Sequence, residues 1–178
     1  MNLKLSTLAL AACALAGTAQ AAIFTVTGDT TGAPTYNRAV SDFSALSGLG
    51  TSVAYEILDF TVDVSGNYTF LTTAAFDSFV FLYSPSFNPT SALSNGLTAN
   101  DDLLSLTTSG FAFDLTAGTS YQYVVTGFDN GEFGSFSTTI GGPGVVTVVP
   151  EPETYALLML GLGVVGLAAR RRQRAIEA

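Results

Sequence analysis

The stretch Phe79-Val80-Phe81-Leu82-Tyr83 is apolar at every position and decides the fold. Aromatic and β-branched side chains favour strands, in which neighbouring side chains point to opposite faces. A strand that is apolar on both faces is typical of the centre of a sheet. In a second stretch, the apolar residues Tyr121, Tyr123 and Val125 alternate with Gln122, Val124 and Thr126. Both stretches are therefore predicted to be strands, and the first is predicted to be central.

Shorter runs with the same period of two lie on either side of these stretches. They are Ile23 to Thr27, Val53 to Val64, Tyr68 to Phe70, Phe111 to Asp114 and Phe136 to Ile140. Turn-forming residues separate several of the runs, as in Ser65-Gly66-Asn67, Ala117-Gly118-Thr119 and Asp129-Asn130-Gly131. Because no helical period competes with this pattern, residues 22–140 are predicted to form an all-β domain, a single β-sandwich of jelly-roll type.

Two stretches of the middle region fit the strand pattern less well. Arg38 to Leu49 is compatible with a short helix or with a segment that covers a sheet edge. The sequence Gly141-Gly142-Pro143-Gly144 is rich in residues that interrupt regular structure. Residues 141–149 are therefore predicted to be a linker between the domain and the C-terminal region.

Charge is distributed unevenly along the chain. Residues 22–149 contain eleven acidic side chains and a single basic one, Arg38, which gives this part a net charge of −10. Such a surface cannot neutralise phosphates, so nucleic-acid binding is excluded. The sequence has no His, which excludes Ser-His-Asp and Cys-His catalysis. We therefore expect a non-catalytic protein and not an enzyme.

The first 21 residues have the organisation of a secretory signal peptide. An apolar run follows Lys4, and Ala19 and Ala21 form a small-x-small cleavage site. Cleavage after Ala21 would remove Cys13 and leave an exported domain without disulfides. Two alternatives remain, namely an uncleaved membrane helix and a lipoprotein signal read from Leu10-Ala11-Ala12-Cys13, which would place a lipid on the cysteine.

The C-terminal region has the pattern of a single membrane span. Residues 154–169 are uncharged and mostly apolar, which predicts a transmembrane helix. The cytoplasmic stop cluster that follows consists of Arg170, Arg171, Arg172 and Arg174. Because positive residues stay in the cytoplasm, this cluster places the acidic domain outside the membrane. The alternative is a buried core helix, which fits poorly with a charge-free run that ends in clustered arginines.

Three features follow one another at the end of the chain: Pro150-Glu151-Pro152, a short apolar helix and an arginine cluster. This arrangement resembles the PEP-CTERM sorting domain of Gram-negative bacteria, and the resemblance covers residues 150–174. It implies that an exosortase, a membrane protease-transpeptidase, acts at Pro150, Glu151 and Pro152 and removes the tail. It further implies an inner-membrane tethered precursor that is delivered to the cell surface or extracellular matrix.

A second resemblance covers much of the middle domain. It is carried, in this order, by Tyr68-Thr69-Phe70, Phe76 to Tyr83, Asn100-Asp101-Asp102, Leu115 to Tyr121 and Val124 to Phe128. Together these segments are similar to the bacterial pre-peptidase C-terminal domain, a small β-sandwich. Members of that family are non-catalytic modules appended to secreted enzymes, and some relatives bind calcium. Because no enzyme is attached here, the resemblance implies the fold more than the role.

Several carboxylates are predicted to lie on loops. Asp77 precedes the central strand, Asp101 and Asp102 follow Asn100, and Asp129 begins an oxygen-rich turn. Oxygen ligands on loops suit Ca²⁺, so these four aspartates are candidate calcium ligands, and no other cofactor is expected. The alternative is that the Asp and Asn residues of these loops only build turns.

Exposed aromatic rings would favour carbohydrate binding, because sugars stack on them. Most rings of this sequence lie at strand positions that a core requires, which leaves Phe87 and Phe133, in loops, as candidates for an exposed surface.

Two functions remain. One is a non-catalytic structural protein of the cell surface or of the extracellular polysaccharide matrix, and the other is a calcium-dependent module that binds carbohydrate or another surface. The first is the preferred hypothesis.

Overall fold

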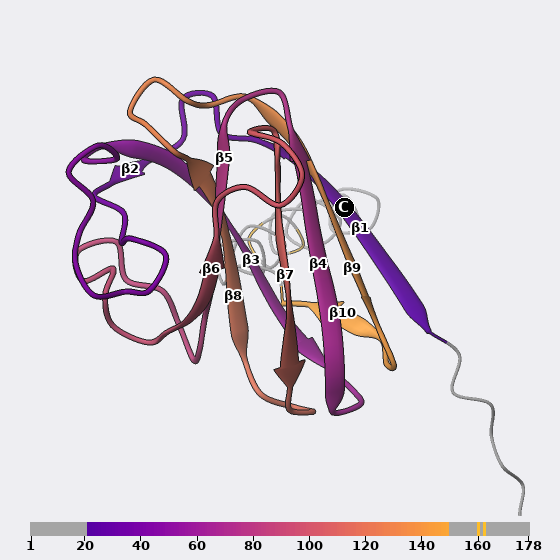
Figure 1. Ribbon diagram of the computed structural model, residues 1–178. Coiled ribbons are helices and arrows are strands. Elements are labelled where there is room, and N and C mark those ends of the chain that lie inside the picture. Colours follow the sequence, from indigo (N-terminus) through magenta and orange to yellow (C-terminus); the bar gives the residue numbers. More distant parts are fainter. Residues whose placement is uncertain (1–20, 150–159, 161, 163–178) are drawn as a thin grey trace, which may run out of the picture.

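The computed structural model describes residues 21–149, 160 and 162 (Figure 1). This part of the chain is all-β, and its ten strands form two antiparallel sheets. The strands are β1 (Ala22–Asp29), β2 (Thr35–Tyr36), β3 (Val53–Val62), β4 (Gly66–Ala74), β5 (Ser78–Tyr83), β6 (Gly96–Asn100), β7 (Thr108–Leu115), β8 (Tyr121–Gly127), β9 (Ser135–Gly142) and β10 (Val146–Val148). The predicted all-β class is confirmed, and the two sheets are consistent with a β-sandwich.

The two sheets draw their strands from all parts of the domain. One sheet has four strands in the order β1-β9-β4-β7, and the other has the order β10-β3-β8-β5-β6, with β2 paired to β3. The strands β1 and β9 pair along their whole length, from Ala22 opposite Gly142 to Asp29 opposite Ser135. Figure 1 shows them side by side at one edge of the molecule. Contacts between the two ends of the domain sequence therefore close the four-stranded sheet.

The central position predicted for the stretch around Phe81 is confirmed. β5 lies between β8 and β6, and all six of its side chains are buried. β8 lies between β3 and β5 and is buried at every position except Gln122. A strand can be apolar on both faces only where both faces are covered, which is the case for these two neighbours.

Apolar side chains cover both faces of the six-stranded sheet. The cluster between the two sheets includes Phe60, Phe70, Val80, Leu82, Tyr123 and Ile140. The cluster on the outer face includes Phe79, Phe81 and Tyr83 of β5, together with Tyr36, Ala39, Phe87 and Ala92. These last four residues come from β2 and from the loops after β2 and β5. The outer face of the sheet is thus buried by loops and not by a third sheet.

The segment Arg38 to Leu49 forms no helix. Within it, Ala39 and Leu46 pair as an isolated bridge that closes a compact loop. Phe43 packs edge-on against Phe81, with ring centroids 5.7 Å apart. The segment therefore covers a face of the six-stranded sheet and not its edge, because the apolar outer face of β5 has to be removed from water.

Residues 141–149, predicted to be a linker, are largely part of the sheets. β9 continues through Gly142, and β10 pairs with β3 so that Val148 lies opposite Phe60. A Cβ at Gly142 would meet the Tyr68 ring, which already occupies that space. The glycine therefore reflects close packing against an aromatic ring and not a flexible connection.

Several sequence predictions fall outside the described residues. The signal peptide does so except for residue 21, as do the motif Pro150-Glu151-Pro152 and the arginine cluster. Of the predicted span 154–169, only residues 160 and 162 are described. Within the described part of the chain, no helix is long and apolar enough to cross a membrane.

A chain of hydroxyl groups crosses the core between the two sheets. The Oγ1 of Thr72 on β4 lies 2.8 Å from the hydroxyl of Tyr123 on β8 and 2.7 Å from Oγ1 of Thr138 on β9. All three residues are fully buried, so water cannot replace a missing partner. Thr72 therefore satisfies two polar groups in an otherwise apolar core.

Replacing Thr72 with Val should destabilise the domain by about 1–3 kcal/mol, because two buried hydroxyls lose their partner. The measurement is urea unfolding followed by circular dichroism. Thr69→Val is the matched control, since Thr69 is exposed on the same strand, and it should change stability by less than about 0.5 kcal/mol. Adding Tyr123→Phe and Thr138→Val to Thr72→Val should recover part of the loss, because no buried hydroxyl then remains without a partner. Equal effects of Thr72→Val and Thr69→Val would contradict this account.

Candidate functional site

The predicted calcium ligands lie on turns at one end of the domain. Asp77 immediately precedes β5, Asp101 and Asp102 immediately follow β6, and Asp129 follows β8. β5 and β6 pair antiparallel, with Val80 opposite Asn100, so the start of one strand lies beside the end of the other. The pairing of these two strands therefore brings Asp77 close to Asp101 and Asp102.

Three of the four aspartates form a compact acidic cluster. Asp77, Asp101 and Asp102 each offer a carboxylate oxygen, and these three oxygens all lie within 4.8 Å of one another. Asp77 Oδ1 and Asp101 Oδ1 are buried and have no hydrogen-bond partner among the described residues. Carboxylates at this separation repel one another unless a proton or a cation lies between them.

Two carboxyl groups of the cluster have a raised pKa, chiefly because they are buried. The pKa of Asp101 is raised to about 6, chiefly by burial and then by the neighbouring charges of Asp102 and Asp77, while Arg38 acts in the opposite direction. Burial also raises the pKa of Asp77, and the charges of Asp102 and Glu132 act in the same direction. The site is thus short of positive charge at neutral pH, and this is the condition in which a cation binds.

Asp129 is not part of the acidic cluster. Its Oδ1 accepts a hydrogen bond from the Asn130 amide at 2.6 Å, and its carbonyl accepts one from the Glu132 amide at 3.0 Å. The side chain therefore builds the β8–β9 turn, which is the alternative considered for these residues. Glu132 of the same turn lies closer to the cluster, since its Oε2 accepts a hydrogen bond from the Asp77 amide at 3.1 Å.

Arg38, the only basic residue of 22–149, lies close enough to the acidic cluster for its charge to act on Asp77 and Asp101. Its side chain is buried, with the guanidinium 4.3 Å from the centroid of the Phe79 ring and 4.9 Å from that of Phe128. Nε and Nη2 donate to the Phe128 carbonyl, and Nη1 donates to the Ala39 carbonyl. The Phe128 amide in turn donates to the carbonyl of Asp77. Arg38 therefore joins the loop after β2 to the backbone that holds the cluster.

Neither Glu132 nor Arg38 was identified as a site residue from the sequence. Glu132 belongs to the oxygen-rich turn that begins at Asp129, so composition alone could have included it. The role of Arg38 depends on Phe79 and Phe128, which are distant in the sequence, and only its isolation among acidic residues marked it. The oxygen donors of the cluster and its neighbour suit a hard cation such as Ca²⁺, which takes six to eight oxygen ligands.

The two candidate aromatic residues behave differently. Phe133 is 49 % exposed, as expected for a residue of an exposed loop. Phe87 is only 7 % exposed, and its ring packs 4.9 Å from that of Tyr36 and 4.9 Å from that of Tyr83. The prediction of an exposed surface is therefore wrong for Phe87, because the loop after β5 folds back over the sheet.

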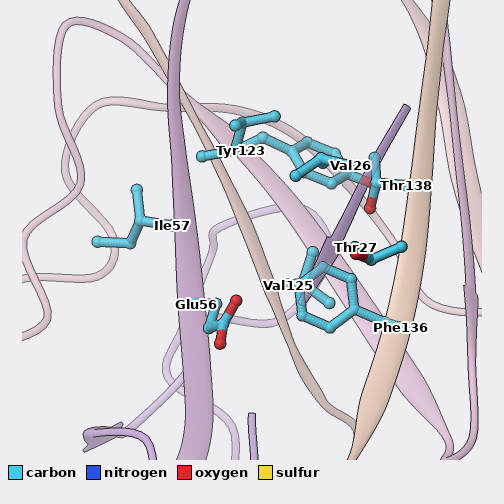
Figure 2. Close-up of a pocket in the computed structure, with 9 residues that line it drawn as sticks. Val26, Thr27, Glu56, Ile57, Tyr123, Val125, Phe136 and Thr138 are labelled. Atoms are coloured by element: carbon cyan, nitrogen blue, oxygen red, sulfur yellow. The ribbon is translucent and has the colours of Figure 1, made fainter. Parts of the chain in front are cut away.

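A small pocket opens between β1 and β3 (Figure 2). Its volume is about 50 Å³, and it is lined by Val26, Thr27, Glu56, Ile57, Leu58, Tyr123, Val125, Phe136 and Thr138. Figure 2 shows the Glu56 carboxylate directed into the space beside Val125 and Phe136. A cavity needs about 10–15 Å³ of such space to hold one water, so this pocket has room for water and not for an organic ligand.

Comparison with known protein families identifies a PEP-CTERM protein-sorting motif at residues 148–172. This confirms the resemblance stated for the C-terminus, and the motif implies an exported protein that exosortase processes and sorts to the cell surface. The match covers 25 of the 178 residues. The resemblance of the middle domain to the pre-peptidase C-terminal domain therefore stays a prediction. No curated protein sequence matches the chain.

Replacing Asp101 with Asn should raise the Tm at pH 7 by a few degrees in calcium-free buffer. The raised pKa means that the folded state holds its proton more tightly than the unfolded state. The ionised Asp101 therefore destabilises the folded state. This loss of stability develops as the pH rises from about 4, the ordinary pKa of an aspartate, to about 6, the pKa of Asp101 in the folded state. Thermal unfolding of the parent and the variant from pH 3 to pH 8 should show a difference that vanishes near pH 4 and below.

Asp42→Asn is the control with the opposite sign. Hydrogen bonds from Ser44 lower the pKa of Asp42, so its charged form stabilises the folded state above about pH 4. This variant should be less stable than the parent at pH 7, with little difference at pH 3. A Tm for Asp101→Asn that lies below that of the parent at pH 7 would contradict the account of the cluster.

Proposed function

We propose that the protein is a non-catalytic component of the cell surface or extracellular polysaccharide matrix of a Gram-negative bacterium, delivered by its C-terminal signal. The observation that carries this proposal is the sorting motif at residues 148–172, which follows directly on an acidic all-β domain. A strongly negative net charge keeps such a domain soluble after release. The lack of His in the chain removes the commonest general base, which supports a role without catalysis.

The proposal includes two cuts and a defined mature protein. Cleavage after Ala21 removes the signal peptide together with Cys13, and processing at Pro150-Glu151-Pro152 removes the span 154–169 and the arginine cluster. What remains is the β domain, for which we propose the jelly-roll arrangement. When β2 and β10 are left out, the remaining eight strands can be numbered from 1 to 8 in chain order. One sheet then has the order 1-8-3-6, and the other has the order 2-7-4-5. This order supports the finer assignment within the β-sandwich class.

The intact mass of the protein, recovered separately from membrane and medium of its host, tests the sorting route. The released species should run from Ala22 to near Pro150 and should lack the residues from Arg170 onwards. Replacing both Pro150 and Pro152 with Ala should leave a membrane-bound species that retains the tail. Pro143→Ala, which lies outside the motif, should be processed like the parent. A parent protein that stays membrane-bound with its arginines intact would mean a plain membrane anchor.

The acidic cluster supports a second candidate function, that of a calcium-dependent module for carbohydrate or for another surface. The supporting observation is that one carboxylate oxygen each of Asp77, Asp101 and Asp102 lies within 4.8 Å of the others. Two carboxylate oxygens of the cluster are buried and have no hydrogen-bond partner among residues 21–149. A divalent cation would neutralise their repulsion and use these oxygens as ligands. In a matrix, such a cation would also bridge the acidic domain to anionic polymers.

Calcium should raise the Tm of the parent protein, because a ligand that binds only the folded state stabilises it. At a hundred times Kd the stabilisation amounts to about 2.7 kcal/mol. The double variant Asp77→Asn with Asp101→Asn should lose the calcium response, whereas Asp114→Asn, an exposed carboxylate on β7, should retain it. The measurement is thermal unfolding at pH 7 with calcium, with magnesium and with chelator. A calcium response that survives in the double variant would exclude this site.

A further inference from the structure

A pocket of about 260 Å³ lies between the loop after β2 and the loop between β5 and β6. It is lined by Asn37, Leu46, Pro89, Thr90, Ser91, Ala92 and Leu93. None of these side chains is charged, although the domain around them carries eleven acidic residues. The two loops lie after β2 and after the C-terminal end of β5, whereas Asp77 precedes the start of β5. The pocket and the acidic cluster are therefore separate sites.

One amide oxygen in the wall of this pocket has no hydrogen-bond partner in the described part of the chain. Asn37 Oδ1 is buried without a hydrogen bond among the described residues. A buried acceptor that stays unpaired is costly, and a native structure rarely keeps one without a reason. Rotation of the amide by half a turn exchanges its oxygen and nitrogen, so Asn37 can present either a donor or an acceptor to the pocket.

The loop between β5 and β6 is held in place by hydrogen bonds that do not involve a ligand. The Tyr83 hydroxyl donates to the carbonyl of Ala92 at 3.0 Å, and Asn88 Oδ1 accepts from the Thr90 amide at 2.9 Å. Phe87 anchors the same loop in the outer core cluster. A ligand would therefore not have to order this wall of the pocket, which lowers the entropic cost of binding.

The loop after β2 is equally fixed. The bridge between Ala39 and Leu46 closes it, and the Arg38 backbone pairs with both Ser47 and Gly50. Leu46 nevertheless remains about half exposed on the pocket side of this bridge. Both walls of the pocket are thus rigid, and each presents one exposed leucine, since Leu93 is exposed to a similar degree.

The size and chemistry of the pocket restrict the class of ligand. Pockets for drug-sized ligands start at about 300 Å³, so 260 Å³ suits a single small ring. Two leucines and a proline offer an apolar surface, and the Asn37 amide offers a hydrogen bond. The hydroxyls of Thr90 and Ser91 already bond to Asn88 and Ser94, and their oxygens can still accept a further hydrogen bond. A neutral sugar ring combines an apolar C–H face with hydroxyl groups, and the lack of charge in the pocket discriminates against charged rings.

We propose that this pocket binds one uncharged sugar residue of the surrounding polysaccharide, with the Asn37 amide hydrogen-bonded to a ring hydroxyl. That the sugar belongs to the matrix polysaccharide rests on the proposed function, which places the protein in that matrix. Binding at this pocket does not require calcium, because the acidic cluster lies at the other end of β5. The negatively charged protein would then bind the matrix polysaccharide through this uncharged pocket.

The test is an NMR titration of the ¹⁵N-labelled full chain in a zwitterionic detergent that carries no sugar headgroup. The probes are the methyl glycosides of glucose, galactose and mannose, with glucuronate as the charged counterpart. At least one neutral glycoside should shift the amide signals of residues 37–46 and 90–93 with a saturable, millimolar Kd. Glucuronate should bind at least tenfold more weakly, and the response should persist in the presence of chelator.

Asn37→Leu should weaken the binding of that glycoside at least tenfold while leaving the remaining amide signals in place. Asn67→Leu is the matched control, because Asn67 is exposed on β4 in the other sheet, and it should bind like the parent. No response to any neutral glycoside, a response centred elsewhere, or unchanged binding by Asn37→Leu would each overturn the proposal. The titration uses purified protein, so its outcome is independent of whether the tail is processed in the host.

Discussion

The burial of β5 on both faces is the constraint on which the rest of the structure depends. Its inner face requires the four-stranded sheet, and this sheet is closed by pairing β1 with β9 at the two ends of the domain sequence. Its outer face requires the loops after β2 and after β5, whose aromatic residues complete the second core cluster. Those two loops then form the walls of the uncharged pocket, and one of them carries Arg38 to the acidic end. Packing of the core thereby positions both candidate sites.

The strands could be predicted where burial is decided locally, and not where it depends on distant partners. The alternation in Phe79 to Tyr83 identifies a two-sided strand without any knowledge of its neighbours. Gly142 has the composition of a linker, but it pairs with Ala22 in the sheet and packs against the Tyr68 ring, which no local pattern reveals. Phe87 lies in a stretch rich in turn residues, and it is buried only because its loop folds back onto β5. In each case the missing information is a contact between residues far apart in the sequence.

The candidate site could likewise be predicted from the sequence only in part. The residue type was predictable, since aspartates beside strand ends supply oxygen ligands on loops. Which aspartates meet was not, because it follows from the pairing of β5 with β6, and this pairing places Asp77 beside Asp101 while Asp129 builds its own turn. Arg38 was visible as an isolated charge, but its sandwich between the rings of Phe79 and Phe128 depends on the folded arrangement of two loops and a strand. A buried guanidinium satisfied by carbonyl groups holds the cluster's backbone in place, and its charge offsets only part of the cluster's negative charge.

The junction between the domain and the sorting motif links the fold to the proposed route of delivery. The motif begins at residue 148, which is the last residue of β10, and the Val149 amide still donates to the carbonyl of Asp59. The last hydrogen bond of the sheet is therefore made by the residue directly before Pro150, and the sequence leaves no spacer between the sheet and the motif. A three-residue edge strand is the least costly part of a sheet to detach, because few pairs stabilise it. The local stability of β10 therefore limits how easily the chain just before Pro150 separates from the domain.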